Sequence, residues 1–295
     1  MFVELHILQN FAPSNLNRDD TNAPKACEFG GHRRARISSQ CLKRAVRTSF
    51  VDDDLLPPGQ RAVRTRLLAE ELAKRLIAAG KDRSQAEAAA IAALAGFGVD
   101  MDDKDPTKTE YLVFLGRDQL QRLVDECLTH QDDLLDALPA IQKANETKDK
   151  AKRKAARKAA VPDNVQRALE DVFDGSRAAD LALFGRMLAD RPDKKVDAAS
   201  QVAHAISTNR VSTEFDFYTA VDDLQADGET GAGMMGTVEF NSACFYRYSN
   251  VDTAQLVRNL GGDTELARES LEAFIRASIQ AIPTGKQNSM AAHNP

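Results

Sequence analysis

The chain has 295 residues, of which 43% are hydrophobic, and its 39 lysines and arginines against 44 aspartates and glutamates give a net charge of −5. This length predicts one large domain or two domains of about 150 residues each, and the apolar content is sufficient for a buried core. No apolar run approaches the ~20 residues of a membrane span, and the acidic total gives no general affinity for nucleic acid, so any such site must be local.

The beginning of the chain and its cysteines indicate the compartment. MFVELHILQNF has no basic region and alternates like a strand, which argues against a signal peptide. The four cysteines, Cys27, Cys41, Cys127 and Cys244, are far apart and form no CxxC, which argues against disulfides and zinc sites. We therefore expect a cytoplasmic protein that has no membrane contact.

The remaining elements predict an α+β fold. A long polar segment, residues 10–34, follows the first strand and is typical of a functional or disordered loop. Residues 60–190 have helical periodicity, strands return after residue 205, and a last helix is expected at 264–282. Strands at both ends of the chain therefore predict a small sheet domain that carries a helical insertion.

Residues 30–50, GGHRRARISSQCLKRAVRTSF, are basic and contain no acidic residue. Ser38 and Ser39 predict a helix start, after which Gln40, Lys43, Arg44 and Arg47 fall on one side at i, i+3, i+4 and i+7. The free amides and the dipole at the start of this helix add an anion site. An ordinary solvated helix face usually mixes both signs of charge, so we favour a phosphate-binding surface here. The arginines just before it, Arg33, Arg34 and Arg36, add positive charge without an assigned role.

A second basic cluster lies at residues 147–158, TKDKAKRKAARK. It predicts either an exposed helix or arm that touches a nucleic-acid backbone, or a disordered polar connection, and both remain open. The acidic segments 52–54 and 100–105 are expected to face away from nucleic acid or to touch other proteins.

The match to GxGxxG at residues 231–236 does not indicate a dinucleotide site, because the following TVEF predicts a strand rather than a helix. A hairpin tip explains these glycines better. The aromatic residues before it, Phe215, Phe217 and Tyr218, belong either to a core or to an exposed wedge against bases.

Catalytic signatures are few. The histidines show no metal-ligand spacing, and neither GxSxG nor HExxH occurs. The pair Asp19 and Asp20 is able in principle to hold Mg²⁺ for phosphodiester cleavage. We favour the simpler interpretation that these carboxylates pair with nearby arginines such as Arg18 and fix the loop, and we expect no cofactor and no metal.

Four segments carry a family resemblance. Residues 5–47 resemble the N-terminus of the backbone subunit of the type I-E CRISPR Cascade complex, and the similarity recurs at 203–225, 240–262 and 283–295. The helical middle is less similar. Family members continue beyond the segment that resembles AHNP, so a chain that stops at Pro295 is expected to have an incomplete sheet domain.

The resemblance implies an RRM-like (ferredoxin-like) palm at 1–59 and 181–295, helical fingers at 60–180 and a β-hairpin thumb at 211–240. It also implies a non-catalytic subunit that stacks head-to-tail with copies of itself along the CRISPR guide RNA. Each thumb kinks the RNA and leaves bases free to pair with a target DNA strand. The other partners implied are the large, small, 5′-end-capping and guide-processing subunits of Cascade.

Site residues follow from the same resemblance. The residues expected to contact guide RNA are Arg18, Lys25, Ser38, Gln40, Lys43 and Arg47, with Arg44 added from the helical phase, and Met187, Phe217 and Tyr218 near the kink. The residues expected to contact target DNA are Lys148, Lys150, Lys152, Arg153, Lys154, Arg157 and Lys158.

Two other functions remain as alternatives. Related backbone subunits of other CRISPR types cut bound RNA with a loop aspartate, which would make this chain a metal-dependent RNA endonuclease that uses Asp19 or Asp20. The other alternative is a free-standing single-strand-binding protein.

Overall fold

The computed structural model describes residues 1–105, 107–220 and 234–293, and they form two compact units. One unit, mostly helical, comprises Met1, Leu56–Ala199 and Asp252–Leu271. The other, built on a sheet, comprises Phe2–Leu55, Ser200–Val251 and Glu272–Pro295. The predicted α+β class is confirmed, whereas the palm, finger and thumb ranges stay predictions.

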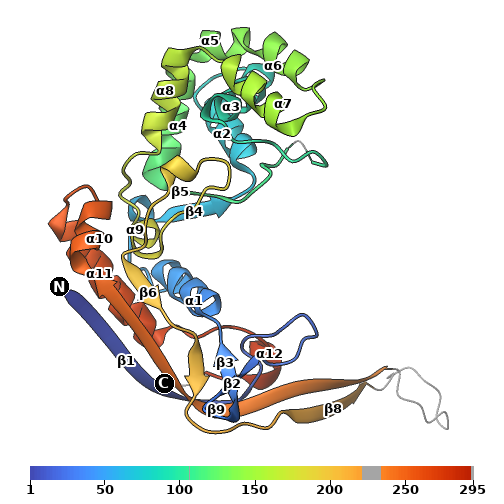
Figure 1. Cartoon of the computed structure of the whole chain (residues 1–295), viewed down its shortest axis with the longest axis vertical. Helices are drawn as coiled ribbons and strands as arrows, with labels where there is room; N and C mark the ends of the chain where they lie inside the picture. Colours follow the sequence, from blue (N-terminus) through green and yellow to red (C-terminus); the bar gives the residue numbers. More distant parts are fainter. Residues whose placement is uncertain (106, 221–233, 294–295) are drawn as a thin grey trace. The chain divides into compact units, whose positions relative to one another are not determined.

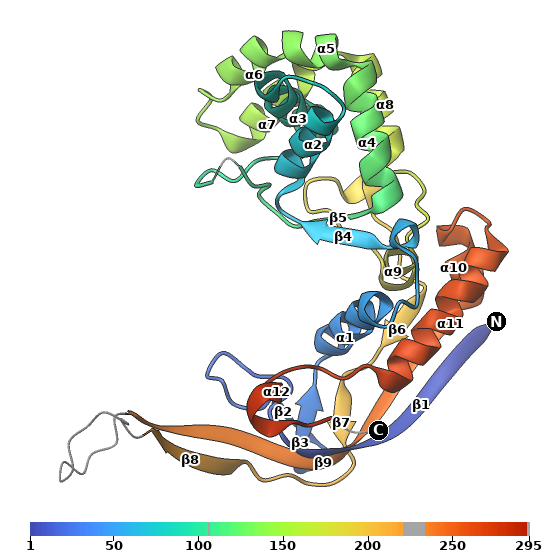
Figure 2. The ribbon, with the colours of Figure 1, turned by 180° about the vertical axis from the view of Figure 1, so that it is seen from behind.

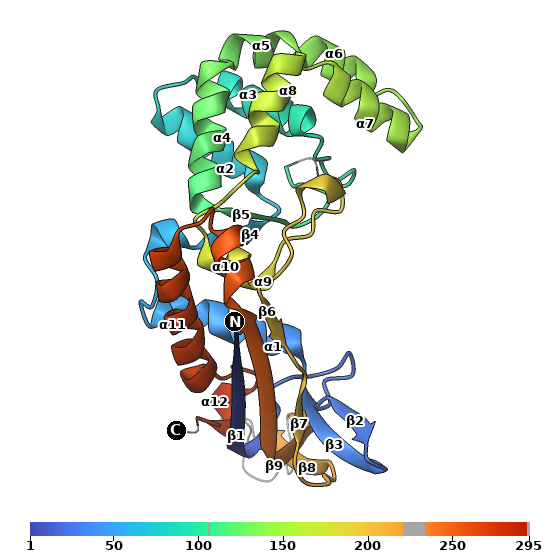
Figure 3. The ribbon, with the colours of Figure 1, turned by 60° about the vertical axis from the view of Figure 1, so that its left-hand side comes forward.

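The sheet unit contains one mainly antiparallel sheet with the strand order β1-β9-β7-β3-β2, to which β6 and β8 add by pairing with β9 (Figure 3). Its strands are β1 (Phe2–Ser14), β2 (Ala26–Phe29), β3 (His32–Ile37), β6 (Ser200–Val202), β7 (Ala205–Ser207), β8 (Glu214–Ala220) and β9 (Met234–Asp252). Its helices are α1 (Ser39–Asp52), α12 (Gln287–Met290) and the end of α11 (Thr264–Gln280).

One face of this sheet is covered by α1. Residues that alternate along β3, Ala35 and Ile37, are at most 2% exposed and pack with Leu42 of α1 and Phe245 of β9. The residues between them, such as Arg36, therefore point to the opposite, open face. This alternation separates a helix-covered side of the sheet from a side that the described residues leave uncovered.

The long segment at 10–34 is not one loop, which corrects the sequence interpretation. It contains the end of β1, the whole of β2 and the start of β3. The turn between β2 and β3 is formed by Gly30 and Gly31, with φ of 62° and 74°. Two successive residues with positive φ are the requirement of a tight hairpin turn, and glycine meets it without strain.

The helical unit is a bundle above a short sheet of β4 (Ala62–Thr65) and β5 (Val113–Gly116) (Figure 1). Its other elements are α2 (Leu68–Ala78), α3 (Arg83–Phe97), α4 (Arg117–Thr129), α5 (Gln131–Asp136), α6 (Leu138–Ala144), α7 (Lys150–Ala159), α8 (Asp163–Val172), α9 (Ala179–Phe184) and α10 (Thr253–Asn259). The alanine-rich α3 is buried along most of its length, since small side chains let α2 and α8 approach it closely. No helix among the described residues is both long and apolar enough to cross a membrane.

Candidate nucleic-acid interface

The basic helix begins where the sequence predicts. The Ser38 hydroxyl accepts the Cys41 backbone N–H at 3.3 Å, and the Ser38 N–H donates to Asn17 Oδ1 at 2.8 Å. These two contacts cap α1 and fix it to the preceding loop. No acidic side chain lies in the first turn of α1, so the positive potential of its N-terminus is not neutralised there.

The phase of α1 is also as predicted. Leu42, Val46, Ser49 and Phe50 are buried, while Gln40 and Arg44 are exposed and Lys43 and Arg47 half-buried. We call Gln40, Lys43, Arg44 and Arg47 the α1 surface. Burial lowers the pKa of Lys43 because it removes water from the ammonium group, and a phosphate would compensate for that lost hydration.

The loop before β2 is held by Asp19. Its Oδ1 accepts the N–H of Thr21 at 2.9 Å, the hydroxyl of Thr21 at 2.8 Å and the N–H of Ala23 at 3.0 Å. These hydrogen bonds, led by the Thr21 hydroxyl, hold the pKa of Asp19 below its ordinary value. Asp19 therefore fixes the loop, through backbone and hydroxyl groups rather than through the arginine that the sequence suggested, while Asp20 is exposed.

Both predicted cations of this loop belong to the sheet unit, like α1. Lys25 is half-buried, with its backbone bonded to Asn17 and Arg36 at 2.9 Å each. Arg18 is exposed, and its Nη1 donates to Asn22 Oδ1 at a long 3.4 Å. Because Asn17 accepts the Lys25 N–H through its backbone and the Ser38 N–H through its side chain, the loop and the start of α1 are neighbours.

The predicted hairpin exists, and its two arms, β8 and the start of β9, extend from the sheet unit (Figure 2). Phe215 and Phe217 are 67% and 64% exposed and share one side of β8. Tyr218 points to the other side, where its ring covers Gly236 so closely that a Cβ there would lie 2.5 Å from the Tyr218 hydroxyl. The two rings assigned to the wedge thus differ, since Phe217 is free on the surface and Tyr218 completes the strand pair.

The glycine motif lies partly outside the described residues, which resume at Met234. Gly236 is in β9, paired with Tyr218. A strand therefore follows the motif, as the sequence predicts, and a helix N-terminus for a pyrophosphate does not.

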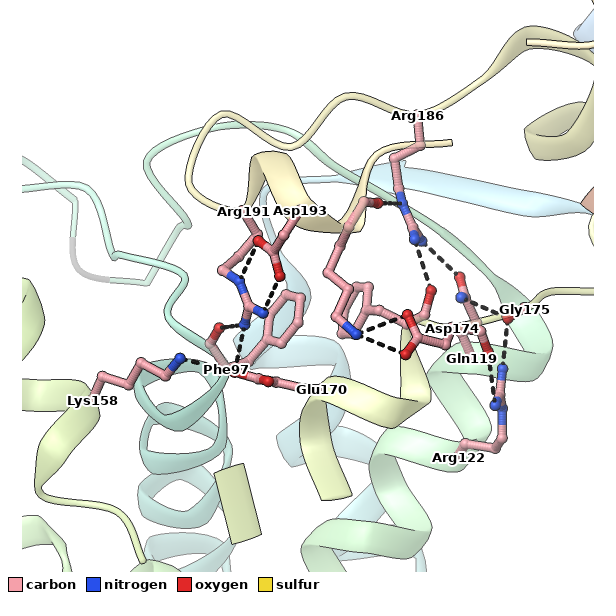
Figure 4. A network of polar contacts seen from close by, with 12 residues as sticks. Phe97, Gln119, Arg122, Lys158, Glu170, Asp174, Gly175, Arg186, Arg191 and Asp193 are labelled. Carbon is pink, nitrogen blue, oxygen red and sulfur yellow. Dashed lines mark hydrogen bonds and ion pairs between the residues drawn. The ribbon is translucent and has the colours of Figure 1, made fainter. Parts of the chain in front are cut away.

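Met187 is 84% exposed, whereas its neighbour Leu188 is 3% exposed. On its other side Arg186 is buried and donates to Lys194 O at 3.0 Å, Gln119 Oε1 at 3.1 Å and Phe173 O at 2.8 Å (Figure 4). The segment 185–195, which we call the Met187 loop, is thus attached to the helical unit directly beside the exposed methionine.

A second arginine fixes the far end of the Met187 loop. Arg191 donates to Phe97 O at 2.6 Å and to both carboxylate oxygens of Asp193, at 2.9 and 2.6 Å (Figure 4). Its guanidinium lies 4.8 Å from the centre of the Phe97 ring, which stacks on Phe173 at 3.8 Å. An apolar side chain presented on a loop held at both ends is an arrangement suited to contact with a partner.

The second basic cluster forms an ordered helix, so the alternative of a disordered connection is wrong. Most of its cations are already paired with carboxylates of the same unit, which corrects the expectation that the acidic segment 100–105 faces away. The ion pairs are Lys150–Glu110, Arg153–Asp103, Lys154–Asp190, Arg157–Asp100 and Lys158–Glu170. Among the described residues no such pair is found for Lys148 or Lys152, and both are exposed.

Carboxylate oxygens of Asp100, Glu110 and Asp190 lie within 4.8 Å of one another. Each of the three carboxylates pairs with a cation of α7. Desolvation raises the pKa of Asp100, and Arg157 opposes that effect. We therefore interpret these three carboxylates as the ion-pair partners that hold α7 in place, rather than as a metal site.

The predicted residues thus fall into two groups. The α1 surface, the loop cations and the hairpin rings belong to the sheet unit, and Met187 and α7 belong to the helical unit. The sequence interpretation missed a group of rings on the open face of the sheet, His6, Tyr246 and Tyr248. The alternation of His6 with the apolar Leu5 and Ile7 was a usable signal.

The chain is similar to solved structures and to one family model. Among curated proteins no sequence matches the chain. A chain of a solved "CRISPR RNA-guided surveillance complex, pre-nicking" is 34% identical, with a TM-score of 0.79, over 99% of this chain and 75% of that one. A chain of a "CRISPR RNA-guided surveillance complex" is 30% identical, with a TM-score of 0.67, over 97% and 73%. The family model described as CT1975-like protein (Cas_CT1975) matches residues 3–295, and the chain belongs to this family.

Proposed function

We propose that the chain is a non-catalytic, guide-RNA-binding backbone subunit of a type I-E Cascade complex. The observation that carries the proposal is the α1 surface, a Ser38-capped helix that presents cations on one side and has no acidic residue in its first turn. Family membership and the similarity to chains of CRISPR surveillance complexes support the same role.

The contacts would be to phosphate rather than to bases. Lysine and arginine side chains with free helix amides bind any nucleic-acid backbone, and they carry no direct information on sequence. Arg18 and Lys25 would add further phosphate contacts along the loop that Asp19 holds. In RNA-guided recognition the guide bases read the target, so such a subunit needs only to hold the backbone in a fixed shape.

Exposed apolar groups would shape the guide. Phe217 on the hairpin and Met187 on its anchored loop are available to press against bases, because stacking tolerates any sequence. Copies would associate head-to-tail, which generates an open filament along the RNA. The cations of α7 would approach the target DNA strand, and the remaining Cascade subunits would close the ends of the filament.

The test is recovery of RNA with a tagged full-length chain from cells that express its partner subunits and a CRISPR array. The expected RNA is a guide of uniform length. Lys43→Ala with Arg47→Ala should reduce the retained RNA severalfold, because two phosphate contacts are removed. The matched control is Lys74→Ala with Lys143→Ala, two exposed lysines on α2 and α6, which should leave retention unchanged.

Two results would contradict the proposal. Random RNA fragments without partner subunits would indicate a free-standing single-strand-binding protein. Mg²⁺-dependent cleavage of a complementary RNA that Asp20→Ala abolishes would indicate a nuclease.

A further inference from the structure

The open face of the sheet carries a groove on the side opposite α1. It has a volume of about 740 Å³, within the roughly 300–1,000 Å³ of ligand sites. Its lining comes from strands β1, β2, β3, β7 and β9 and is mainly apolar and aromatic. We call it the sheet-face groove. No residue assigned above to RNA or DNA lines it.

The β1–β9 side of the groove is a platform of rings. His6 stacks on Tyr246 with centroids 6.1 Å apart and lies 5.1 Å from Tyr248. The rings are fixed at their polar edges, since His6 Nδ1 is 2.7 Å from the Tyr246 hydroxyl and Tyr248 donates to Glu4 at 2.8 Å. Tyr246 nevertheless remains 42% exposed, so a ring face is available to a flat partner.

The β3–β7 side of the groove is positive. Arg36 Nη1 donates to His204 Nδ1 at 3.1 Å, and His204 is exposed in the groove lining. Because a guanidinium only donates, Nδ1 of His204 is the acceptor and its Nε2 carries the proton. Arg34, which lines the groove and donates to Ser207 O and Thr208 O, adds a second cation on this side. Positive charge thus comes from Arg34 in the lining and from Arg36 behind His204, and the Nε2–H of His204 supplies a donor.

We propose that the sheet-face groove is a second binding site for single-stranded nucleic acid, where an unpaired base stacks on Tyr246 and His6 and its phosphate lies toward Arg36 and His204. A flat aromatic platform beside cations fits a nucleotide, because it offers a surface to the base and a counter-charge to the phosphate. The site is independent of the α1 surface, which lies on the opposite face of the same sheet.

The chain contains no tryptophan, so Tyr246→Trp creates a single reporter in the groove. Single-stranded oligouridine and oligothymidine of about five nucleotides are titrated into the full-length protein, along with an abasic strand of the same length. Both base-bearing strands should quench the tryptophan saturably, and the difference between them shows whether RNA or DNA is preferred. The abasic strand should bind at least about fivefold more weakly, because stacking is lost.

Further variants show which site on the protein produces the tryptophan quenching. Arg36→Ala in the reporter background should weaken binding severalfold, and Lys43→Ala with Arg47→Ala should leave the quenching in place. Ile77→Trp, at a 40% exposed residue of α2 that is assigned to neither RNA nor DNA, is the control reporter and should not respond. If Tyr246→Trp fails to fold, Phe29→Trp places the reporter at another lining residue, 61% exposed.

Three results would overturn the proposal. The first is no quenching by either base-bearing strand. The second is quenching that disappears with the α1 substitutions, which would assign the bases to the α1 site. The third is a spectral change that depends on protein concentration alone, which would mean that a second copy of the chain covers the groove. None of these results depends on whether the chain retains a guide RNA in cells.

Discussion

Some arginines in this chain support the fold and others are exposed to solvent, and burial distinguishes the two groups. Arg186 is 4% exposed, and desolvation lowers its pKa to about 10. Its guanidinium donates to neutral oxygens and lies 5.4 Å from the Phe173 ring centre, so it supports the Met187 loop. Arg44, by contrast, is exposed on α1. A count of arginines therefore overstates the positive charge that a phosphate can reach.

Asp193 should make the Met187 loop sensitive to acid. Its pKa falls from the ordinary 3.8 to about 2, mainly through the hydrogen bond from Arg191. A lowered carboxylate pKa stabilises the fold above the unfolded value, so this contribution is complete above about pH 4 and is lost as the pH falls toward 2. Asp193→Asn should flatten the pH dependence of the free energy of unfolding in that window, measured by urea denaturation.

The matched control for this experiment is Asp197→Asn, an exposed carboxylate with only a 3.5 Å contact to Lys195. Equal flattening in both variants would show that the Arg191–Asp193 contact does not carry the effect.

At the scale of elements, local patterns were predictable and distant pairing was not. The start and phase of α1 follow from Ser38 and from spacings within two turns. The hairpin of β2 and β3 was missed because its strands are short and polar, although the Gly30–Gly31 pair was a turn signal. The ion pair between Arg153 and Asp103 joins residues far apart in sequence, and no local pattern encodes it.

Within α7, paired and unpaired lysines should behave differently. Lys148→Ala with Lys152→Ala should weaken target-DNA retention by an assembled complex up to about fivefold and leave stability unchanged. Lys154→Ala with Lys158→Ala should lower the free energy of unfolding by about 1–3 kcal/mol, because Asp190 loses Lys154, and Glu170 loses Lys158 while it keeps its ion pair with Arg191. Filter binding and urea denaturation measure the two effects.

A larger effect of the paired lysines on DNA retention would contradict this prediction. If the Lys154 and Lys158 substitutions reduce DNA retention more than the Lys148 and Lys152 substitutions at equal stability, the carboxylates do not hold α7 in solution.

For the whole molecule, a net charge of −5 coexists with a local basic surface. Carboxylates near α7 are engaged in internal ion pairs, and the cations of α1 lie on one side of a helix that has no acidic residue in its first turn. Net charge governs solubility and long-range attraction, whereas a local surface governs contact. An acidic total charge is therefore compatible with the proposed RNA binding at the α1 surface.

Salt should accordingly weaken RNA binding despite the acidic total. For single strands the slope of log affinity against log salt is about −0.7 per neutralised phosphate. Lys43→Ala should make the slope shallower by about 0.7, by equal amounts for guides of unrelated sequence, as measured by titration at several salt concentrations. A slope that is unchanged, or that varies with sequence, would show that Lys43 does not neutralise a phosphate.

The ion pairs between α7 and its three carboxylate partners have a thermodynamic consequence. The carboxylates of Asp100, Glu110 and Asp190 act as built-in counterions for α7. A phosphate that displaces one of them sets free a carboxylate, which must recruit a cation from solution. Fewer ions are then released overall, so phosphate contacts made by Lys150, Lys154 and Arg157 should depend less on salt than contacts made by Lys148 and Lys152, for which the described residues provide no ion pair. As the salt concentration rises, the paired cations should therefore account for a growing share of the nucleic-acid binding by this region.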